Sequence, residues 1–369
     1  MKTLACIVGA RPNFVKMGPI LAALKPYSRQ IRPVLVHTGQ HYDAAMSDLF
    51  FCQLHLQKPD VHLHVGSGRQ GEQTAKILAA YEEWLLDAKP RPSATLVVGD
   101  VNSTVACALA SVKLGIPVIH VEAGLRSFDR TMPEEINRVL TDAISDLLLV
   151  SEPSGIKNLA AEGRPKSAVK LVGNVMIDAL RDHLPVAKRL RTLHKLRLSP
   201  NQFILWTMHR PSNVDDDRTL ASWVRAMQDI GERVPIVFPV HPRTRARLAA
   251  NGTWAKLTNR SGIIATEPLG YLECLSLSSQ ALAVVTDSGG LQEEATVLRI
   301  PCLTLRKNTE RPITVSQGTS TLVGQDCDKL IGLVKEIRND RYKRGRVPKL
   351  WDGHAAGRIA EIIARFLSS

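Results

Sequence analysis

Short runs of Val, Ile and Leu alternate with segments of helical periodicity, and this alternation restricts the fold more than any other feature. In the first half of the chain, buried strands are predicted at residues 3–8, 34–37, 95–98, 118–121, 147–150 and 169–172. Helical periodicity lies between them, for example at residues 15–24, 73–86 and 103–113. Repeated strand–helix units form parallel sheets covered by helices on both faces, so an α/β fold is predicted.

The same alternation restarts in the second half. A second series of strands is predicted at residues 203–208, 236–240, 263–265, 283–286 and 302–305. A chain of 369 residues is longer than one hydrophobic core usually serves, so two domains are expected. We place them at residues 1–172 and 173–353, followed by an amphipathic helix at residues 355–366.

Residues that suit anion binding follow the first predicted strand. Ligands of open α/β sheets bind beyond the carboxyl ends of the strands, so two such domains would enclose a site in the cleft between them. Gly9 allows a tight turn after residue 8, and Arg11 and Lys16 then lie near a helix N-terminus. A surface arginine at such a turn is the alternative interpretation of Arg11.

Carboxylates follow the next strands of the first half. Asp100 follows residues 95–98, Glu122 directly ends residues 118–121, and Glu134 lies in a helix that begins after Pro133. Asp100 could merely cap a helix, and one of Glu134 and Glu135 could simply suit a helix start. Three carboxylates in one crevice would raise one another's pKa, which suits proton transfer near neutral pH.

The second half carries what resembles a nucleotide site. His209 ends the strand at residues 203–208, and Ser288, Gly289 and Gly290 open a helix whose free N–H groups would cradle a diphosphate. Glu294 lies one turn into that helix, where a carboxylate could hold ribose hydroxyls. Arg311 follows the strand at residues 302–305 and adds a cation.

A glycine-rich segment at residues 66–71 matches the G-x-G-x-x-G pattern of dinucleotide-binding loops. The residues before it make a poor central strand, and the acidic Asp100 follows later than the roughly 20 residues that the pattern requires. A mobile lid is predicted here instead. His62 and His64 have no third ligand nearby, so an exposed strand edge is favoured over a metal site.

The formal charge of +13 indicates an anionic partner. Aromatic residues make up only 5% of the chain and none alternates with the basic clusters, which excludes nucleic acid as the expected partner. No apolar run reaches the roughly 18 residues of a membrane span, and no targeting segment is evident, so the cytoplasm is expected. The cysteines lie far apart and are predicted to be small core residues: Cys6, Cys52, Cys107, Cys274, Cys302 and Cys327.

Over essentially its whole length the chain resembles the non-hydrolysing UDP-N-acetylglucosamine 2-epimerases. The resemblance is carried by GARPNFVK at residues 9–16, HTGQHYD at 37–43, GDVNST at 99–104, HVEAGLRSFDRTMPEEINR at 120–138, GNVMIDAL at 173–180, TDSGGLQEEA at 286–295 and TERP at 309–312. It implies two Rossmann-like domains like those of B-type glycosyltransferases, with the C-terminal helix, residues 354–369, joining the first domain. It also implies a homodimer.

The resemblance further implies roles for individual residues. Arg11 and Lys16 would contact phosphate and sugar, and Asp100, Glu122 and Glu134 would be the acid/base carboxylates at the sugar's C2. His209 would act near the departing UDP. The remaining contacts to UDP would come from Ser288, Gly289, Gly290, Glu294 and Arg311. The implied reaction eliminates UDP to give 2-acetamidoglucal and adds it back, and requires no metal or redox cofactor.

Two departures from the bacterial pattern affect the substrate and its regulation. Pro211 and Ser212 follow Arg210 where a second arginine and a glutamate are common, and the loop between Glu122 and Glu134 is the shorter form. These changes put activation by substrate in doubt and leave room for a 2,3-diacetamido-uronic acid or a 6-deoxy sugar. The sequence also leaves open a glycosyltransferase of the same architecture or a non-catalytic sensor of sugar nucleotides.

Overall fold

The computed structural model describes residues 1–39, 57–258 and 262–368. The chain forms two compact units, the first comprising Met1–Arg181 with Lys349–Ser369 and the second comprising Asp182–Pro348. Each unit contains one parallel sheet between helices, which confirms the predicted fold class. Within the described ranges, no helix is long and apolar enough to cross a membrane.

The first unit is built on a seven-stranded sheet with the order β3-β2-β1-β4-β5-β6-β7. Its strands are β1 (Lys2–Val8), β2 (Ile31–His37), β3 (Val61–His62), β4 (Ala94–Val98), β5 (Val118–Ala123), β6 (Leu147–Val150) and β7 (Val169–Leu171). Its helices are α1 (Arg11–Leu24), η1 (Lys25–Tyr27), α3 (Gln70–Asp87), α4 (Asn102–Lys113), α5 (Pro133–Ile144), α6 (Pro153–Ala161), the N-terminal half of α7 (Val175–Arg189), and α17 (Ala355–Ser368).

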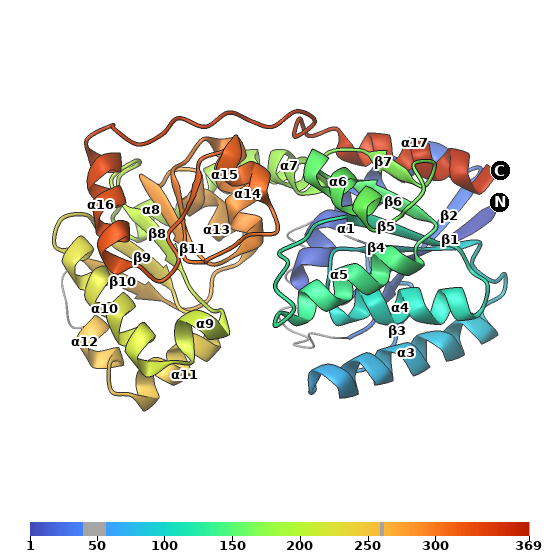
Figure 1. Ribbon diagram of the computed structural model, residues 1–369, viewed down its shortest axis with the longest axis horizontal. Helices are drawn as coiled ribbons and strands as arrows, with labels where there is room; N and C mark the ends of the chain where they lie inside the picture. Colours follow the sequence, from blue (N-terminus) through green and yellow to red (C-terminus); the bar gives the residue numbers. More distant parts are fainter. Residues whose placement is uncertain (40–56, 259–261, 369) are drawn as a thin grey trace. The chain divides into compact units, whose positions relative to one another are not determined.

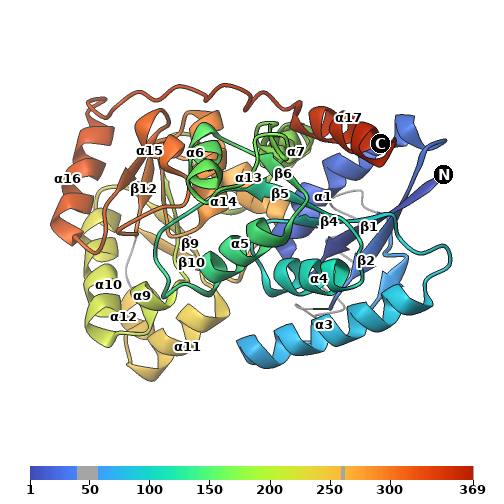
Figure 2. The ribbon, with the colours of Figure 1, turned by 45° about the vertical axis from the view of Figure 1, so that its right-hand side comes forward.

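Helices cover both faces of this sheet because its strands are apolar on both faces. Helices α3, α4 and α5 lie side by side on one face, whereas α1 and α17 pack together on the other (Figures 1 and 2). Ala5 and Ile7 of β1 and Val97 of β4 belong to the core beneath α3 and α4. A strand buried on both faces reads as a continuous apolar run, which explains why these strands were predictable.

The second unit is built on a six-stranded sheet with the order β10-β9-β8-β11-β12-β13. Its strands are β8 (Ile204–Thr207), β9 (Ile236–Pro239), β10 (Ile263–Thr266), β11 (Ala283–Thr286), β12 (Cys302–Thr304) and β13 (Ser320–Leu322). Its helices are α8 (Thr192–Lys195), α9 (Pro211–Val214), α10 (Asp217–Gly231), α11 (Pro242–Ala250), α12 (Trp254–Thr258), α13 (Tyr271–Ser278), α14 (Gly289–Leu298), α15 (Pro312–Ser316) and α16 (Cys327–Arg338).

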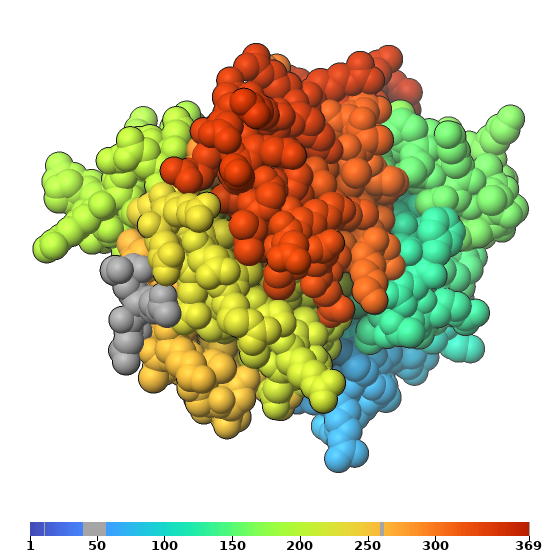
Figure 3. Space-filling view, turned by 60° about the vertical axis from the view of Figure 1, so that its left-hand side comes forward, coloured from blue at the N-terminus to red at the C-terminus, as the bar shows by residue number. Residues whose placement is uncertain are grey.

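Alternate residues of β8 contribute to two separate cores. Ile204 and Trp206 pack with residues of α10 and α16, whereas Leu205 packs on the opposite face with residues of α8 and α13. Figure 3 shows the outer side of the first of these layers, where the red atoms of α16 lie next to the yellow atoms of α10. The two cores hold the central strands in place, and the loops at their ends are held with them.

Several predictions of detail differ from the structure. The first unit extends to Arg181 and resumes at Lys349, rather than ending at residue 172 and resuming at 354. The reason is that Asp178 of α7 accepts hydrogen bonds from the backbone N–H groups of Ala355 and Ala356, and so ties α7 to the start of α17. The short strands β3 and β13 were not among the predicted ones. Five of the six cysteines are described and are unpaired in disulfides, and Cys52 lies outside the described residues.

Candidate active site

The predicted site residues of the first unit follow strands that are neighbours in the sheet. The order β2-β1-β4-β5 reverses direction between β1 and β4, and ligands of open α/β sheets bind at such a switch point. Lys16 lies on the helix after β1, Asp100 follows β4, and Glu122 lies in β5. Parallel strands end at one edge, so the sheet places these three residues at the same edge. The convergence of Asp100, Glu122 and Glu134 stays a prediction.

Lys16 and Glu122 form a buried ion pair. The Lys16 Nζ and Glu122 Oε2 atoms are 2.5 Å apart, and the two residues are 7% and 4% exposed. Asn13 steadies the same helix turn, because its side chain donates to the carbonyl of Val98 at 2.7 Å and accepts from the N–H of Ala10 at 3.1 Å. Each buried charge needs the other, so both side chains are held in one arrangement.

Glu122 has a backbone conformation that non-glycine residues rarely adopt. Its φ is +70°, and the pairing of β5 with β6 shifts register between Val121 and Ala123. A β-bulge of this kind redirects a side chain, and the left-handed region costs an L-residue about 1–2 kcal/mol. The strained bulge therefore directs the Glu122 carboxylate toward Lys16.

Asp100 is held by Arg138 rather than used as a helix cap. A guanidinium N–H of buried Arg138 donates to Asp100 Oδ2, and the Asn137 side chain donates to the Asp100 carbonyl at 2.9 Å. The residue at the N-cap of α4 is Val101, and no side chain caps that helix. The Asp100 side chain is 29% exposed, so it pairs with a cation and still reaches solvent.

The structure separates the roles of Glu134 and Glu135. Glu135 is buried and accepts the N–H groups of Ser127 and Phe128 at 2.9 Å and 2.8 Å, while Arg138 donates to the same carboxylate at 2.7 Å. Burial opposes its ionisation, but these hydrogen bonds hold the pKa of Glu135 below its usual value. Glu135 is thus structural, and half-buried Glu134 remains available at the start of α5.

The diphosphate cradle predicted in the second unit lies at that sheet's own switch point. The order β9-β8-β11-β12 reverses between β8 and β11, which are followed by His209 and by Ser288. Ser288 is the N-cap of α14, and Gly289 and Gly290 form its first turn. The first N–H groups of a helix have no partner within it and attract anions. A side chain at Gly289 would meet Glu310 Oε1 at 2.8 Å and would displace the Glu310 carboxylate.

Asp287 orients His209 beside this helix start. Its Oδ1 lies 2.8 Å from His209 Nδ1, and its Oδ2 accepts the N–H groups of His209 and Arg210 at 2.9 Å and 2.8 Å. Burial disfavours the charged form, but the His209 ring and these N–H groups lower the pKa of Asp287 to about 2. An ionised carboxylate only accepts hydrogen bonds, so Nδ1 carries the hydrogen and Nε2 is left for a ligand.

Glu294 and Arg311 are more buried than the sequence indicated. Glu294 is 3% exposed, and burial raises its pKa to about 8. Arg311 lies between two carboxylates, because it donates from Nε to Glu293 and from Nη1 to Glu310 at 2.8 Å. Both predicted contacts to the nucleotide stay predictions.

The remaining sequence predictions have different outcomes. Arg11 begins α1, but its side chain lies outside the described part of the structure, as do the last four residues of the HTGQHYD motif, 40–43. The glycine-rich residues 66–71 follow β3, the edge strand, and not a central strand at the switch point, as a dinucleotide loop would. Gln70 nevertheless reaches the start of α4, because the Asn102 side chain donates to its Oε1 at 2.8 Å. His62 lies in that edge strand and is half-buried, and its Nε2 lies 2.6 Å from His37 Nδ1.

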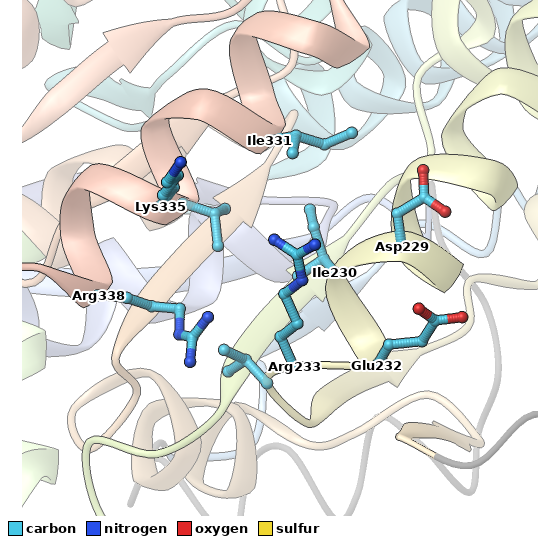
Figure 4. A pocket seen from close by; sticks show the side chains of 9 residues that line it. Asp229, Ile230, Glu232, Arg233, Ile331, Lys335 and Arg338 are labelled. Atoms are coloured by element: carbon cyan, nitrogen blue, oxygen red, sulfur yellow. The ribbon is translucent and has the colours of Figure 1, made fainter.

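A hollow of about 200 Å³ between α10 and α16 does not belong to the candidate site (Figure 4). Charged side chains surround an apolar floor that includes Ile230 and Ile331. The hollow lies at the C-terminal end of α10, which leads into β9, and therefore at the amino ends of the strands. His209 and Ser288 follow the carboxyl ends, at the opposite edge of this sheet.

Sequence reasoning missed three residues that hold candidate site residues in place. Arg138 and Asn137 lie in the quoted motif at residues 120–138, one turn after Glu134, and that helical spacing could have identified them. Asp287 directly precedes Ser288, and its contact with His209 joins residues far apart in sequence, which no local pattern indicates.

The two sheets and their switch-point residues define a two-domain α/β protein of the Rossmann-like class that includes B-type glycosyltransferases. The family model described as UDP-N-acetylglucosamine 2-epimerase matches residues 24–364. The chain is 42% identical to the UDP-N-acetylglucosamine 2-epimerase of Methanocaldococcus jannaschii, covering 98% of both chains. It is 41% identical to the UDP-2,3-diacetamido-2,3-dideoxy-D-glucuronate 2-epimerase of Pseudomonas aeruginosa, covering 99% of this chain and 100% of that one.

Solved structures agree with these relatives. The crystal structure of the M. jannaschii UDP-GlcNAc 2-epimerase in complex with UDP-GlcNAc and UDP matches with a TM-score of 0.89 at 41% identity, covering 98% of this chain and 99% of that chain. The UDP-GlcNAc 2-epimerase of Neisseria meningitidis bound to UDP-GlcNAc matches with a TM-score of 0.88 at 29% identity, covering 99% and 100%. The chain belongs to the UDP-N-acetylglucosamine 2-epimerase family.

The strained backbone of Glu122 predicts an unusual order of stabilities. Glu122→Gly and Glu122→Ala both remove the carboxylate, but only glycine adopts φ near +70° without strain. We expect the glycine variant to exceed the alanine variant by about 1 kcal/mol in free energy of unfolding, measured with urea. At the adjacent buried Ala123, substitution by glycine should lower stability instead. A glycine variant at position 122 that is less stable than the alanine variant would contradict the strain.

The raised pKa of Glu294 predicts a pH dependence of stability. The unfolded chain ionises this carboxyl near its ordinary value of 4.5, whereas the folded protein keeps it neutral up to about pH 8. Its stabilising contribution is therefore complete below about pH 4.5 and is lost as the pH rises toward 8. Compared with Glu294→Gln, the unmodified protein should lose up to about 1.4 kcal/mol per pH unit in this window, in urea unfolding. Parallel pH profiles of the two proteins would contradict the assignment.

Proposed function

We propose that this chain catalyses the reversible C2 epimerisation of UDP-N-acetylglucosamine to UDP-N-acetylmannosamine. The observation that carries the proposal is a set of two ion pairs at the switch point of the first unit. Glu122 binds Lys16 there, and Asp100 binds Arg138. Half-buried Glu134 opens the nearby helix α5. A glycosyltransferase of the same class would not need three carboxylates in this unit.

The reaction begins with transfer of the C2 proton of the sugar to a carboxylate. The C–H electron pair forms the C1=C2 bond, and the C1–O bond breaks with its electrons leaving on UDP. The glycal then accepts UDP at C1 and a proton on the opposite face of C2. We propose that Asp100, Glu122 and Glu134 share the base and acid roles, and that Lys16 and Arg11 contact the sugar and phosphate.

Departure of UDP requires that the diphosphate be stabilised as charge develops on it. The first turn of α14, at Ser288, Gly289 and Gly290, offers N–H groups and the positive end of a helix dipole. The Nε2 atom of His209 faces the ligand, since Asp287 binds Nδ1, and a ring with hydrogens on both nitrogens would donate through it to the diphosphate. We propose that these groups hold the diphosphate, and that Glu294 and Arg311 serve the ribose end of the nucleotide.

The proposal is tested by incubating the purified protein with UDP-GlcNAc in D₂O. We expect UDP-ManNAc to form, with deuterium entering C2 of both sugars. UDP-2,3-diacetamido-2,3-dideoxy-D-glucuronate should be assayed in parallel, because the chain is equally similar to the Pseudomonas relative that is named for it. A strong preference for the diacetamido-glucuronate would refute UDP-N-acetylglucosamine as the substrate. If no deuterium entered C2 of either sugar, the proposed reaction would be refuted.

Neutral amides at the carboxylates should abolish turnover while sparing the fold. We expect Asp100→Asn and Glu134→Gln to lower kcat by about 10²–10⁴-fold, the range typical of acid–base groups. Affinity for UDP, measured by calorimetry, should change little, because neither carboxylate is among the proposed contacts to UDP. Glu83→Gln on the exposed side of α3 is the matched control. Unchanged kcat in either variant would remove that residue from the mechanism.

We propose further that a second copy of the chain covers helix α5. This helix buries polar residues, among them Asn137, Thr141 and Asp142, and exposes apolar ones, which is the reverse of the usual arrangement. Ile136, Val139 and Leu140 are 41–49% exposed and follow the i, i+3, i+4 spacing of a stripe that packs against another helix. In a two-fold dimer the same stripe is used by both copies.

The dimer is tested by sedimentation of a charged variant. Val139→Lys with Leu140→Lys should convert a dimer into monomers, because two buried lysines would face each other across the interface. Val186→Lys alters an exposed apolar residue on α7 and should leave the dimer intact. A monomeric unmodified protein would refute the proposal, as would an unaltered dimer in the double variant. A cytoplasmic location stays a prediction.

A further inference from the structure

The strained conformation of Glu122 must be maintained by the residues around it. The bulge in β5 places Glu122 at φ +70° between two residues of ordinary strand pairing, Val121 and Ala123. Such conformations persist only where the surrounding structure determines them more than once. The ion pair with Lys16 holds the carboxylate, but it does not contact the backbone on either side.

Asp142 of α5 binds the chain on both sides of Glu122. Its Oδ2 accepts the N–H of Gly124 at 2.9 Å, and its Oδ1 lies 2.7 Å from Nδ1 of His120. These partners are two residues after and two residues before Glu122. Asp142 is fully buried, and a side chain at Gly124 would meet the Gly155 carbonyl oxygen at 2.5 Å. One carboxylate therefore bridges the bulge within tightly packed surroundings.

His120 extends this network to Asp100. Its Nε2 lies 2.8 Å from the carbonyl oxygen of Gly99, the residue before Asp100. A carbonyl only accepts, so Nε2 carries a hydrogen. The pKa of Asp142 is lowered, since contacts with His120 and Arg126 outweigh its burial, and its carboxylate therefore also accepts from Nδ1. Acceptor oxygens thus lie at both ring nitrogens, and the His120 ring links the two strand ends.

Arg126 completes the charge balance of the network. Its Nη1 lies 2.7 Å from Asp142 Oδ2, and its other nitrogens bind Glu162 at 2.6 Å and 2.8 Å. His120 and Arg126 thus face two carboxylates, Asp142 and Glu162. The His120 Nδ1 atom and the Gly124 N–H bind Asp142, whereas Glu162 binds Arg126. Glu162 therefore pairs with Arg126 without bridging the bulge.

We propose that Asp142 is a positioning residue that holds the Glu122 carboxylate in its reactive place, through Gly124 and His120. This inference rests on the proposed epimerisation, because it assigns Asp142 a role in the same site. A misplacement of about 1 Å at a reacting group can cost about a hundredfold in rate. Asp142 itself is buried and acts through Glu122.

The test is Asp142→Asn, which preserves the shape but replaces one acceptor oxygen by a donor. We expect kcat to fall by about tenfold or more with KM changed by less than about threefold, since UDP-sugar binding also relies on the second unit. Glu162→Gln makes the same charge change beside Arg126 and should keep kcat within about twofold. Equal losses in the two variants would reduce Asp142 to a structural role and overturn the inference.

A double-mutant cycle separates positioning from independent effects. If Asp142 acts through Glu122, adding Asp142→Asn to Glu122→Gln should lower kcat no further. Multiplying losses would overturn the inference. Should Asp142→Asn fail to fold, His120→Gln removes one arm of the bridge and should lower kcat with UDP binding retained, whereas full activity would contradict the bridge.

A crystal structure of Asp142→Asn distinguishes failure of this inference from failure of the proposed function. We expect Glu122 to leave the left-handed region or its contact with Lys16 to break. An unchanged Glu122 would overturn the positioning role even if the unmodified protein were active. An unmodified protein without epimerase activity would refute the proposed function, whatever the geometry of this variant.

Discussion

Parallel strands share one direction, and this constraint determines where every candidate functional side chain lies. In each unit the strand order reverses once near the centre, between β1 and β4 and between β8 and β11. The connections after those strands diverge to opposite faces of the sheet and leave the edge open to a ligand. Lys16, Asp100 and Glu122 gather at one such edge, and His209 and Ser288 gather at the other. The proposed chemistry is thus divided, with the proposed proton-transfer groups in the first unit and the proposed diphosphate-binding groups in the second.

Buried charges at these edges are held in pairs and small networks. Glu122 binds Lys16, Asp100 binds Arg138, and Asp287 binds His209. Such pairs add little net stability, because removal of both charges from water offsets their attraction. Their value lies in geometry: each partner limits the positions that the other can occupy. Preorganised charge of this kind is the main source of rate acceleration in many enzymes, since no reorganisation is needed when the reaction occurs.

The sequence predicted what depends on local pattern and failed where distant contacts decide. The buried strands were readable because both faces of each sheet are covered, and the helix start at Ser288, Gly289 and Gly290 was readable from its glycines. The left-handed conformation of Glu122 could not be predicted from the sequence, because glutamate rarely adopts it. Here the bulge and the contacts of Asp142 impose this conformation. The choice between Glu134 and Glu135 was also out of reach, since it depends on which glutamate meets Ser127 and Arg138. β3 and β13 are two and three residues long, too short for a periodic signal.

The central claim is that the bond between the sugar and UDP breaks and forms again during each epimerisation. It is tested most directly with UDP-GlcNAc that carries ¹⁸O in the oxygen joining C1 to the β-phosphorus. If UDP departs, its terminal phosphate rotates before re-addition, and the label should move from the bridging position to the non-bridging β-phosphate oxygens, as seen by ³¹P NMR. Epimerisation with the label retained in the bridge would contradict the account.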